Sequence, residues 1–375
     1  MKYRSFKRIF ACLCLLFSIW PAQAGEPSPA FLKGESFLKQ GDFQRALTKA
    51  ETAYRNAKIT RLEYFKLKGA VYNGLQNNTA LAELCRDALT LYPKEGEFYY
   101  LRACTYKDTQ NPKEALADLN KAIALSPNSA KAYLKRARIL FVLTENLSGG
   151  DYLKQARADL KRSIELDGTQ AEAFDYQGIW LSTEGKYQEA ISSFSKAISL
   201  NNNDYRYFSH RAGAYRTVNE LEKALSDMDR LVVLRPNVSQ GWLTRAETLE
   251  QMKRYDDALA SYERAVKLDQ NKGDSRKARA RLNLRIGKYK EAIVDLDFLV
   301  KLSPADDEHY WNRGLAWQGL KQYDRALKDF NIAIDLNPQL PSYYESRAKL
   351  NNLRGEKNQA AQDKRRADKL RQERI

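Results

Sequence analysis

The chain has 375 residues, of which 43% are hydrophobic and 29% charged, so its composition is that of a folded protein. A mean hydropathy of −0.64 excludes a protein built of many membrane spans. The two histidines, His210 and His309, exclude a histidine-rich metal centre, and the net charge of +16 favours anionic partners or surfaces.

Residues 1–24 have the pattern of a secretory signal peptide. Four basic residues lie within the first eight, an apolar run of twelve residues follows over 9–20, and Ala22-Gln23-Ala24 precedes Gly25 as a cleavage signature. Twelve apolar residues are too few to span a bilayer, which needs about 20. An uncleaved membrane anchor is the alternative. We therefore expect a periplasmic or secreted protein, whose net charge falls from +16 to +12 because cleavage removes four basic and no acidic residues.

Two cysteines, Cys85 and Cys104, remain after this cleavage, in a compartment that is expected to be oxidising. A disulfide between them is one interpretation. The other is a pair of small apolar side chains buried on helices. Since no C-x-x-C spacing supports redox or zinc chemistry, we expect neither a metal nor a cofactor.

A repeat of 34 residues runs through the rest of the chain. Alanines at this spacing mark it over the C-terminal half: Ala190, Ala224, Ala258, Ala292, Ala326 and Ala360. Ten units can be placed, starting near residues 27, 62, 96, 130, 171, 205, 239, 273, 307 and 341.

Each unit predicts a pair of helices. Positions 4, 8 and 11 share one face of a first helix, and positions 20, 24 and 27 share one face of a second. Position 8 is Gly or Ala in every unit, and position 20 is Ala in nine units, so the two helices can cross closely. A proline at position 32, as at Pro127 and Pro338, ends the second helix.

This pattern resembles the tetratricopeptide repeat family. The unit that starts at 307 shows it most clearly, with Tyr310, Gly314, Trp317, Tyr323, Ala326, Phe330, Ala333 and Pro338. The resemblance covers residues 27–374 and implies an all-α fold, a right-handed α-α superhelical solenoid that forms one domain over residues 25–374. The family uses the concave groove of this solenoid to hold extended peptides or helices of partner proteins.

Two segments depart from the regular repeat. Seven extra residues, Thr144–Gly150, fall in the turn between the helices of the fourth unit, where we expect a loop at the edge of an unbroken solenoid. The last helix, over residues 358–374, is almost entirely polar and is expected to cap the solenoid.

Positions 7 and 23 change together from unit to unit. Six units carry Arg with Asp: Arg102/Asp118, Arg136/Asp159, Arg211/Asp227, Arg279/Asp295, Arg313/Asp329 and Arg347/Asp363. Three units lack both, and only Arg245/Ser261 breaks the rule. We infer an ion pair that joins the two helices of each unit. Shared descent of the repeats is the alternative explanation.

No catalytic constellation is present in the sequence: there is no H-E-x-x-H, no G-x-S-x-G and no Walker-type loop. We therefore expect that the protein is not an enzyme. Nucleic acid is not expected as a partner either, because the export signal takes the chain away from most nucleic acid.

The eighth and ninth units carry the candidate binding residues. The resemblance places positions 2, 5, 9, 12 and 13 of each first helix along the concave face. There the sequence has Lys277, Arg281 and Arg285, followed by Trp311 with Asn312 beside it. Three cations on one stripe repel one another unless they are solvated or matched by carboxylates of a partner. We expect an acidic partner at this stripe, and a solvated basic surface is the alternative.

The sequence is compatible with two functions. The first is an exported scaffold that binds a protein or peptide partner in its groove, for example in envelope assembly. The second is a basic protein that engages an anionic surface without spanning a membrane, whether lipid, polysaccharide or cell-wall polymer. High salt is expected to weaken the second kind of binding more steeply.

Overall fold

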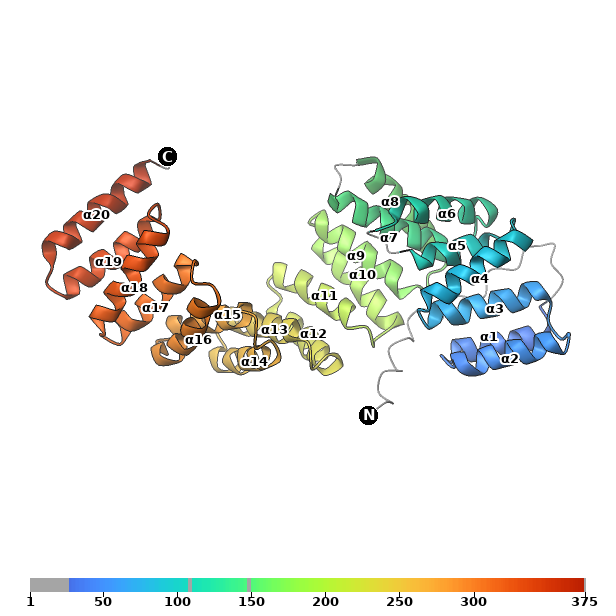
Figure 1. Ribbon diagram of the computed structural model, residues 1–375, viewed down its shortest axis with the longest axis horizontal. Coiled ribbons are helices and arrows are strands. Elements are labelled where there is room, and N and C mark those ends of the chain that lie inside the picture. The colour runs from blue at the N-terminus through green and yellow to red at the C-terminus, as the bar shows by residue number, and fades with distance from the viewer. Residues whose placement is uncertain (1–26, 107–109, 147–149, 374–375) are drawn as a thin grey trace. The chain divides into compact units, whose positions relative to one another are not determined.

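The computed structural model describes residues 27–106, 110–146 and 150–373, and these ranges contain twenty α-helices and no β-strand (Figure 1). The predicted all-α fold is confirmed. The first helices of the ten units are α1 (Pro29–Lys39), α3 (Arg61–Gly74), α5 (Gly96–Thr105), α7 (Ala130–Asn146), α9 (Ala171–Thr183), α11 (Tyr205–Thr217), α13 (Ser239–Gln251), α15 (Asp274–Arg285), α17 (Asp307–Gly319) and α19 (Pro341–Leu353). The second helices are α2 (Phe43–Arg55), α4 (Asn78–Leu91), α6 (Pro112–Leu125), α8 (Gly150–Leu166), α10 (Tyr187–Leu200), α12 (Leu221–Leu234), α14 (Tyr255–Leu268), α16 (Tyr289–Leu302), α18 (Tyr323–Leu336) and α20 (Lys357–Gln372).

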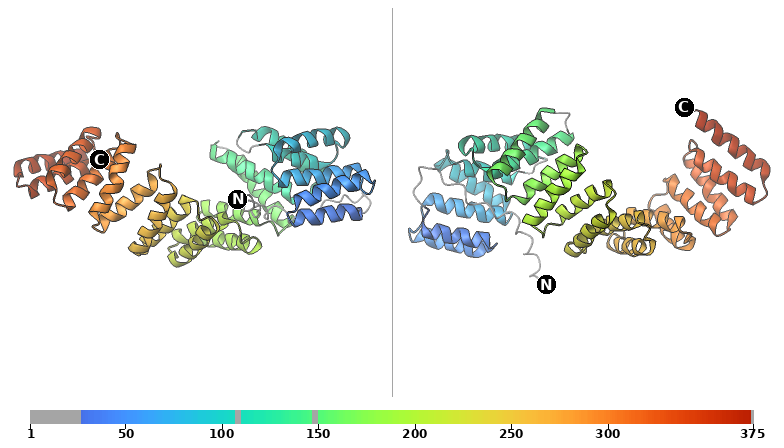
Figure 2. Two further views of the ribbon diagram at one scale, coloured as in Figure 1. Left: turned by 60° about the horizontal axis from the view of Figure 1, so that its bottom comes forward. Right: turned by 180° about the vertical axis from the view of Figure 1, so that it is seen from behind.

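The helices group into two compact parts of the chain, each of which contains several repeats. The part up to residue 214 is called unit 1 below, and the part from residue 215 onward is called unit 2. Within each, a first helix packs against its own second helix, and that second helix packs against the next first helix, as α3, α4 and α5 do in unit 1. Successive first helices also touch, for example α15 and α17 in unit 2. Figure 2 shows this stacking from two further directions. Each hairpin thus buries its apolar face against its neighbours rather than alone.

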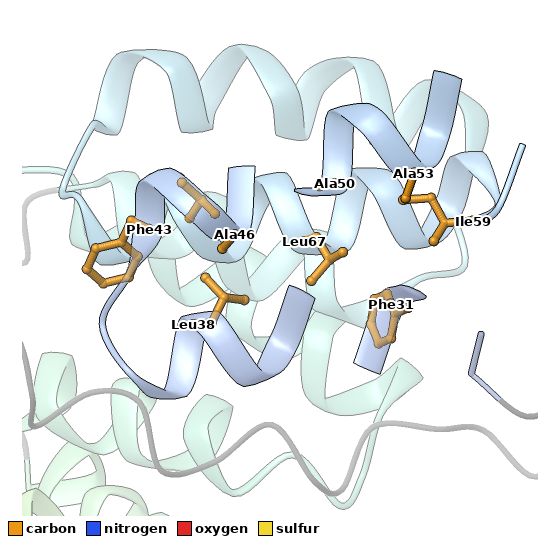
Figure 3. Close-up of a cluster of buried hydrophobic side chains, with 9 residues drawn as sticks. Phe31, Leu38, Phe43, Ala46, Ala50, Ala53, Ile59 and Leu67 are labelled. Carbon is orange, nitrogen blue, oxygen red and sulfur yellow. The ribbon is translucent and has the colours of Figure 1, made fainter. Parts of the chain in front are cut away.

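Within each unit, buried clusters join one repeat to the next. In Figure 3, Phe31 and Leu38 of α1 meet Ala46 of α2 and Leu67 of α3 in one buried cluster. Further clusters join later neighbours in the same way, such as Leu119 of α6 with Ile139 of α7. Because each cluster draws on two repeats, removing one repeat would expose the core of the next.

In two repeats, the glycine at position 8 lies against an aromatic ring of the second helix. A Cβ on Gly314 would lie 2.6 Å from Cε1 of Phe330, and a Cβ on Gly178 would lie 2.5 Å from Cε1 of Phe194. The helices of these two repeats therefore cross close to the glycine, and an aromatic ring of the second helix fills the space that the missing Cβ leaves.

The turn between the two helices contains a left-handed residue in eight of the ten repeats. In these repeats, position 15 has a positive φ whether it is glycine, as at Gly185 and Gly287, or not, as at Gln76, Lys253 and Lys321. At this turn the N–H of Gln322 donates to the carbonyl of Trp317, and the N–H of Lys321 donates to that of Gln318. These bonds satisfy the last carbonyls of the first helix, as in a Schellman motif.

Replacing Lys321 by Gly is expected to stabilise the protein by about 0.5–1 kcal/mol, because its φ of 59° costs an L-residue more than glycine. Gly185 is the matched position in the other direction, and Gly185→Ala is expected to destabilise by a similar amount. Urea unfolding of both variants measures the two effects. A Lys321→Gly variant less stable than the parent protein would contradict the strain argument.

The predicted ion pairs inside the repeats are present. In five of the six repeats, the shortest N–O distances between the guanidinium and the carboxylate are 2.6–2.8 Å: Arg102–Asp118, Arg136–Asp159, Arg279–Asp295, Arg313–Asp329 and Arg347–Asp363. Asp227 lies in unit 2 and Arg211 in unit 1, so that pair is not described. Arg245, the exception in the sequence, binds Ser261 Oγ in place of a carboxylate, at 2.5 Å.

The same arginines also hold the preceding repeat, which the sequence pattern did not reveal. Arg313 Nη1 donates to Asp297 of α16 at 2.8 Å, and Arg347 Nη1 donates to Asn331 of α18 at 2.7 Å. Arg136 reaches Asn120 of α6 in the same way. Each of these arginines therefore links three helices, and the set is called the arginine ladder below.

The insertion in the fourth unit lengthens its helices. α7 continues through Asn146 and α8 begins at Gly150, so both have 17 residues where most of the other helices have 13 or 14. The prediction of a loop over all of 144–150 is therefore wrong at its ends, because Thr144 and Glu145 continue the helix. Residues 147–149 lie outside the described residues.

Within the described ranges, no helix combines the length and the apolar character that crossing a membrane requires. The signal peptide predicted over residues 1–24 lies outside them. α20 buries Ala360, Asp363, Ala367 and Leu370 and exposes most of its remaining side chains, which suits the last helix of a stack.

Candidate partner-binding face

α15 carries five cations among its twelve residues, and they form two groups in the structure. Arg276 and Arg279 turn inward and share the carboxylate of Asp295, which is 0% exposed. Arg276 also lies 4.1 Å from the centre of the Phe298 ring. The other three cations, Lys277, Arg281 and Arg285, are the predicted binding residues, and they lie on the face formed by the first helices α13, α15, α17 and α19. This face is called the first-helix face below.

Lys277 is paired with the next repeat. Its Nζ lies 2.6 Å from Oε2 of Glu308 at the start of α17, and the two side chains are 43% and 47% exposed. This hydrogen bond raises the pKa of the ammonium group above its ordinary value, outweighing partial burial. Because both groups face water, the pair adds little to stability and exchanges readily.

Arg285 is paired with the preceding repeat, and its carboxylate partner is better buried than that of Lys277. Its Nη1 lies 3.1 Å from Oε1 of Glu250, whose side chain is 11% exposed. The hydroxyl of Tyr262 donates to the other oxygen of Glu250 at 2.7 Å. Burial raises the pKa of Tyr262 well above its ordinary value, and the bond to Glu250 adds to this, so the phenol keeps its proton. The Arg285 guanidinium also lies 5.1 Å from the centre of the Tyr255 ring.

Arg281 lies between these two ion pairs and differs from both neighbours. Its side chain is exposed, and within the described part of the chain no carboxylate pairs with it. The predicted stripe of three cations is thus one unpaired guanidinium flanked by two charges that the protein already neutralises.

Trp311 and Asn312 lie on the adjoining helix α17. Trp311 Nε1 donates to Ser346 Oγ of α19 at 2.9 Å, and its ring centre is 5.6 Å from that of Tyr343. The indole is therefore half-buried against the next repeat. Asn312 is also half-buried, and among the described residues its side-chain amide has no hydrogen-bond partner.

Unit 1 pairs the charges of its first helices by the same rule. Lys131 binds Glu97, Arg138 lies 3.3 Å from Glu172, and His210 Nδ1 lies 2.7 Å from Asp175. The partners are 34 or 35 residues apart, and each pair joins the first helices of two adjacent repeats. Only Lys131 and Glu97 occupy the same position, position 2, of their repeats. Sequence reasoning missed these pairs, although opposite charges at one repeat's spacing were the signal that could have found them.

The two cysteines are free thiols in the structure. Burial raises the pKa of Cys85 to about 12 and also raises that of Cys104, so both thiols stay protonated at neutral pH. Their pairing as a disulfide stays a prediction. Across the described ranges, no group of His, Cys, Asp and Glu side chains is placed to hold a metal ion.

An open hollow of about 590 Å³ lies at the turn edge of unit 2, away from these residues. Its lining is mostly charged and comes from Lys321, Tyr323, Asp324, Arg325, Arg354 and Glu356. Arg354 forms ion pairs with both carboxylates of the lining, Asp324 and Glu356.

Comparisons with known proteins agree with the architecture. Family models described as tetratricopeptide repeat match residues 36–226, 239–272 and 277–341. Tetratricopeptide repeat protein 13 of Homo sapiens is 36% identical over 117 residues, which cover 31% of this chain and 13% of that protein. The heat shock protein sti1 homolog of Schizosaccharomyces pombe is 43% identical over 51 residues, or 14% of this chain and 9% of that one.

The chain thus spans only a small part of the length of the curated relatives that it matches. Among solved structures, pilF of Pseudomonas aeruginosa superposes with a TM-score of 0.48 at 19% identity, covering 60% of this chain and 96% of that one. The first family model alone spans more than half of the chain. With its paired helices and its repeat of 34 residues, the chain belongs to the tetratricopeptide repeat family.

Proposed function

We propose that this protein is an exported, non-enzymatic interaction scaffold whose first-helix face in unit 2 binds an acidic segment of a protein partner, in the assembly of the cell envelope. Membership of a family that binds peptides through its first helices supports the interaction role. The observation that carries the site is Arg281, an exposed guanidinium without a carboxylate between two satisfied ion pairs.

The ion pairs that each cation already forms indicate how strongly that cation would contribute to binding such a partner. Arg281 can donate two N–H hydrogen bonds at once to a carboxylate of the partner. Lys277 can exchange Glu308 for a carboxylate of the partner, since its present pair is exposed. Arg285 is held by Glu250 and the Tyr255 ring, so it shapes the site and keeps its own partner. Trp311 and the free amide of Asn312 form the adjoining edge.

Reversing the charge of Arg281 is expected to weaken the binding of an acidic peptide by about tenfold or more. Peptides selected by display on the mature chain are the probe, and their affinities for Arg281→Glu are measured by fluorescence polarisation. We expect Lys277→Glu to have a smaller effect. Lys290→Glu, which changes an exposed cation on the second helix α16, is the matched control and should leave binding unchanged.

The proposal fails if the selected peptides lack acidic residues, or if they bind Arg281→Glu as tightly as the parent chain. The export part has its own measurement. Fractionation of cells that express the full chain should recover a protein that begins at Gly25 in the envelope or the medium, and a product that retains residues 1–24 in the cytoplasm would refute it.

A further inference from the structure

A second set of cations repeats on the second helices, away from the first-helix face. Position 26 is basic in five successive repeats: Lys121, Arg162, Lys196, Arg230 and Arg264. All five side chains are exposed. The position is acidic in the repeat before, at Asp87, and aromatic in the repeat after, at Phe298. The first three lie on α6, α8 and α10 of unit 1 and are called the cation column below.

The cation column differs from the first-helix cations in how its charge is compensated. In the described part of unit 1, no carboxylate pairs with Lys121 or Lys196. Arg162 has one contact with Glu165, at 3.4 Å, in which both side chains are almost half exposed. Such a pair neutralises little. By contrast, Lys131 and Arg138 of the first helices of unit 1 each lie beside a carboxylate of a neighbouring repeat.

The side chain one helical turn before each cation is small. The residue one helical turn earlier is Ala117, Ala158 or Ser192, each of them exposed. No bulky side chain at these positions stands between the ammonium or guanidinium groups and a ligand. No aromatic ring lies there on which a base could stack, and no large apolar side chain lies there that could enter a bilayer.

We propose that the second-helix face of unit 1 binds a linear acidic polysaccharide through Lys121, Arg162 and Lys196. One cation per repeat on three successive hairpins matches a ligand that carries its negative charge at intervals along an extended chain. Sugar carboxylates or sulfates meet this requirement without stacking or insertion. The surface is separate from Arg281, so this proposal does not depend on the function proposed above.

Immobilised polygalacturonate and heparin serve as probes, with the intact mature protein as analyte. Replacing the three cations together, Lys121→Gln, Arg162→Gln and Lys196→Gln, is expected to weaken binding by about tenfold or more and to reduce its salt dependence. The matched control removes three other exposed cations from unit 1, Lys58→Gln, Arg86→Gln and Lys94→Gln, with the same change of net charge. It should bind nearly as well as the parent protein.

Equal losses in the two triple variants would overturn the proposal, because net charge alone would then explain the binding. Tighter binding to poly-U RNA or to phosphatidylglycerol vesicles than to either glycan would overturn the assignment of the ligand. A fall in thermal stability with unchanged glycan binding would mean that the cations only stabilise the ends of their own helices. The conservative variant Lys121→Arg/Lys196→Arg should keep full binding, and Arg281→Glu should keep it as well.

Discussion

Replacing Arg313 by Ala is expected to lower the free energy of unfolding by about 3–5 kcal/mol, the largest effect of any single change considered for this chain. Arg313 donates from Nε and Nη2 to the two oxygens of Asp329, each at 2.8 Å. The Asp329 side chain is 4% exposed. Without the guanidinium, its carboxylate stays buried with no opposite charge beside it.

The double variant Arg313→Ala/Asp329→Ala tests whether this cost comes from the pair. We expect the double variant to lose less stability than the sum of the two single variants, because it leaves no buried charge behind. Urea unfolding of the parent protein, the two single variants and the double variant gives the four free energies of unfolding that this double-mutant cycle needs. Arg264→Ala, which removes an exposed arginine of the same unit, should change stability by less than about 0.5 kcal/mol. Strict additivity would leave shared descent as the reason for the sequence pattern.

Replacing Gly314 by Ala is expected to destabilise by about 1–3 kcal/mol, through overpacking of the helix crossing. The added Cβ would lie 2.6 Å from the Phe330 ring, which is itself fully buried and has little room to move. Phe330→Leu in the same chain should recover part of the loss, because a shorter side chain vacates the space that the new methyl group needs.

Gly213→Ala is the matched control for this change. Nothing lies within 4 Å of a Cβ at this helical position, so the substitution should be neutral or stabilise by about 0.5–1 kcal/mol. Thermal unfolding of the variants compares the two sites. If Gly314→Ala were as well tolerated as Gly213→Ala, the close crossing at position 8 would not be what requires glycine there.

The fold could be predicted from the sequence because of the repeat. The helix preference of a single residue is weak, whereas the same pattern of residues occurs in ten repeats. The ion pairs between the two helices of a repeat could also be predicted, since positions 7 and 23 vary together. The contact of these arginines with the preceding repeat could not be predicted, because the residues that they bind there, Asn120, Asp297 and Asn331, have only their polar character in common. The positive φ of Lys253 and Lys321 was hidden for a similar reason: lysine has no preference for that conformation.

The sequence predicted a candidate site on α15 and α17, and the prediction did not include how the cations of that site are paired. Five cations on α15 read as one basic helix, and only the packing separates Arg276 and Arg279, which hold Asp295, from those that face outward. The partners of Lys277 and Arg285 lie in neighbouring repeats, so their pairing depends on how adjacent hairpins stack. Charge along a single helix cannot report that geometry.

Cross-linking inside cells tests most directly whether the first-helix face beside Arg281 binds the partner. A photoreactive amino acid at Asn312 reports on this face, and one at Val294, which is 65% exposed on the second helix α16, serves as the control. We predict a discrete cross-linked protein from position 312 that disappears when Arg281→Glu is added, and none from position 294. A partner captured equally from both positions, or one unaffected by Arg281→Glu, would contradict the account.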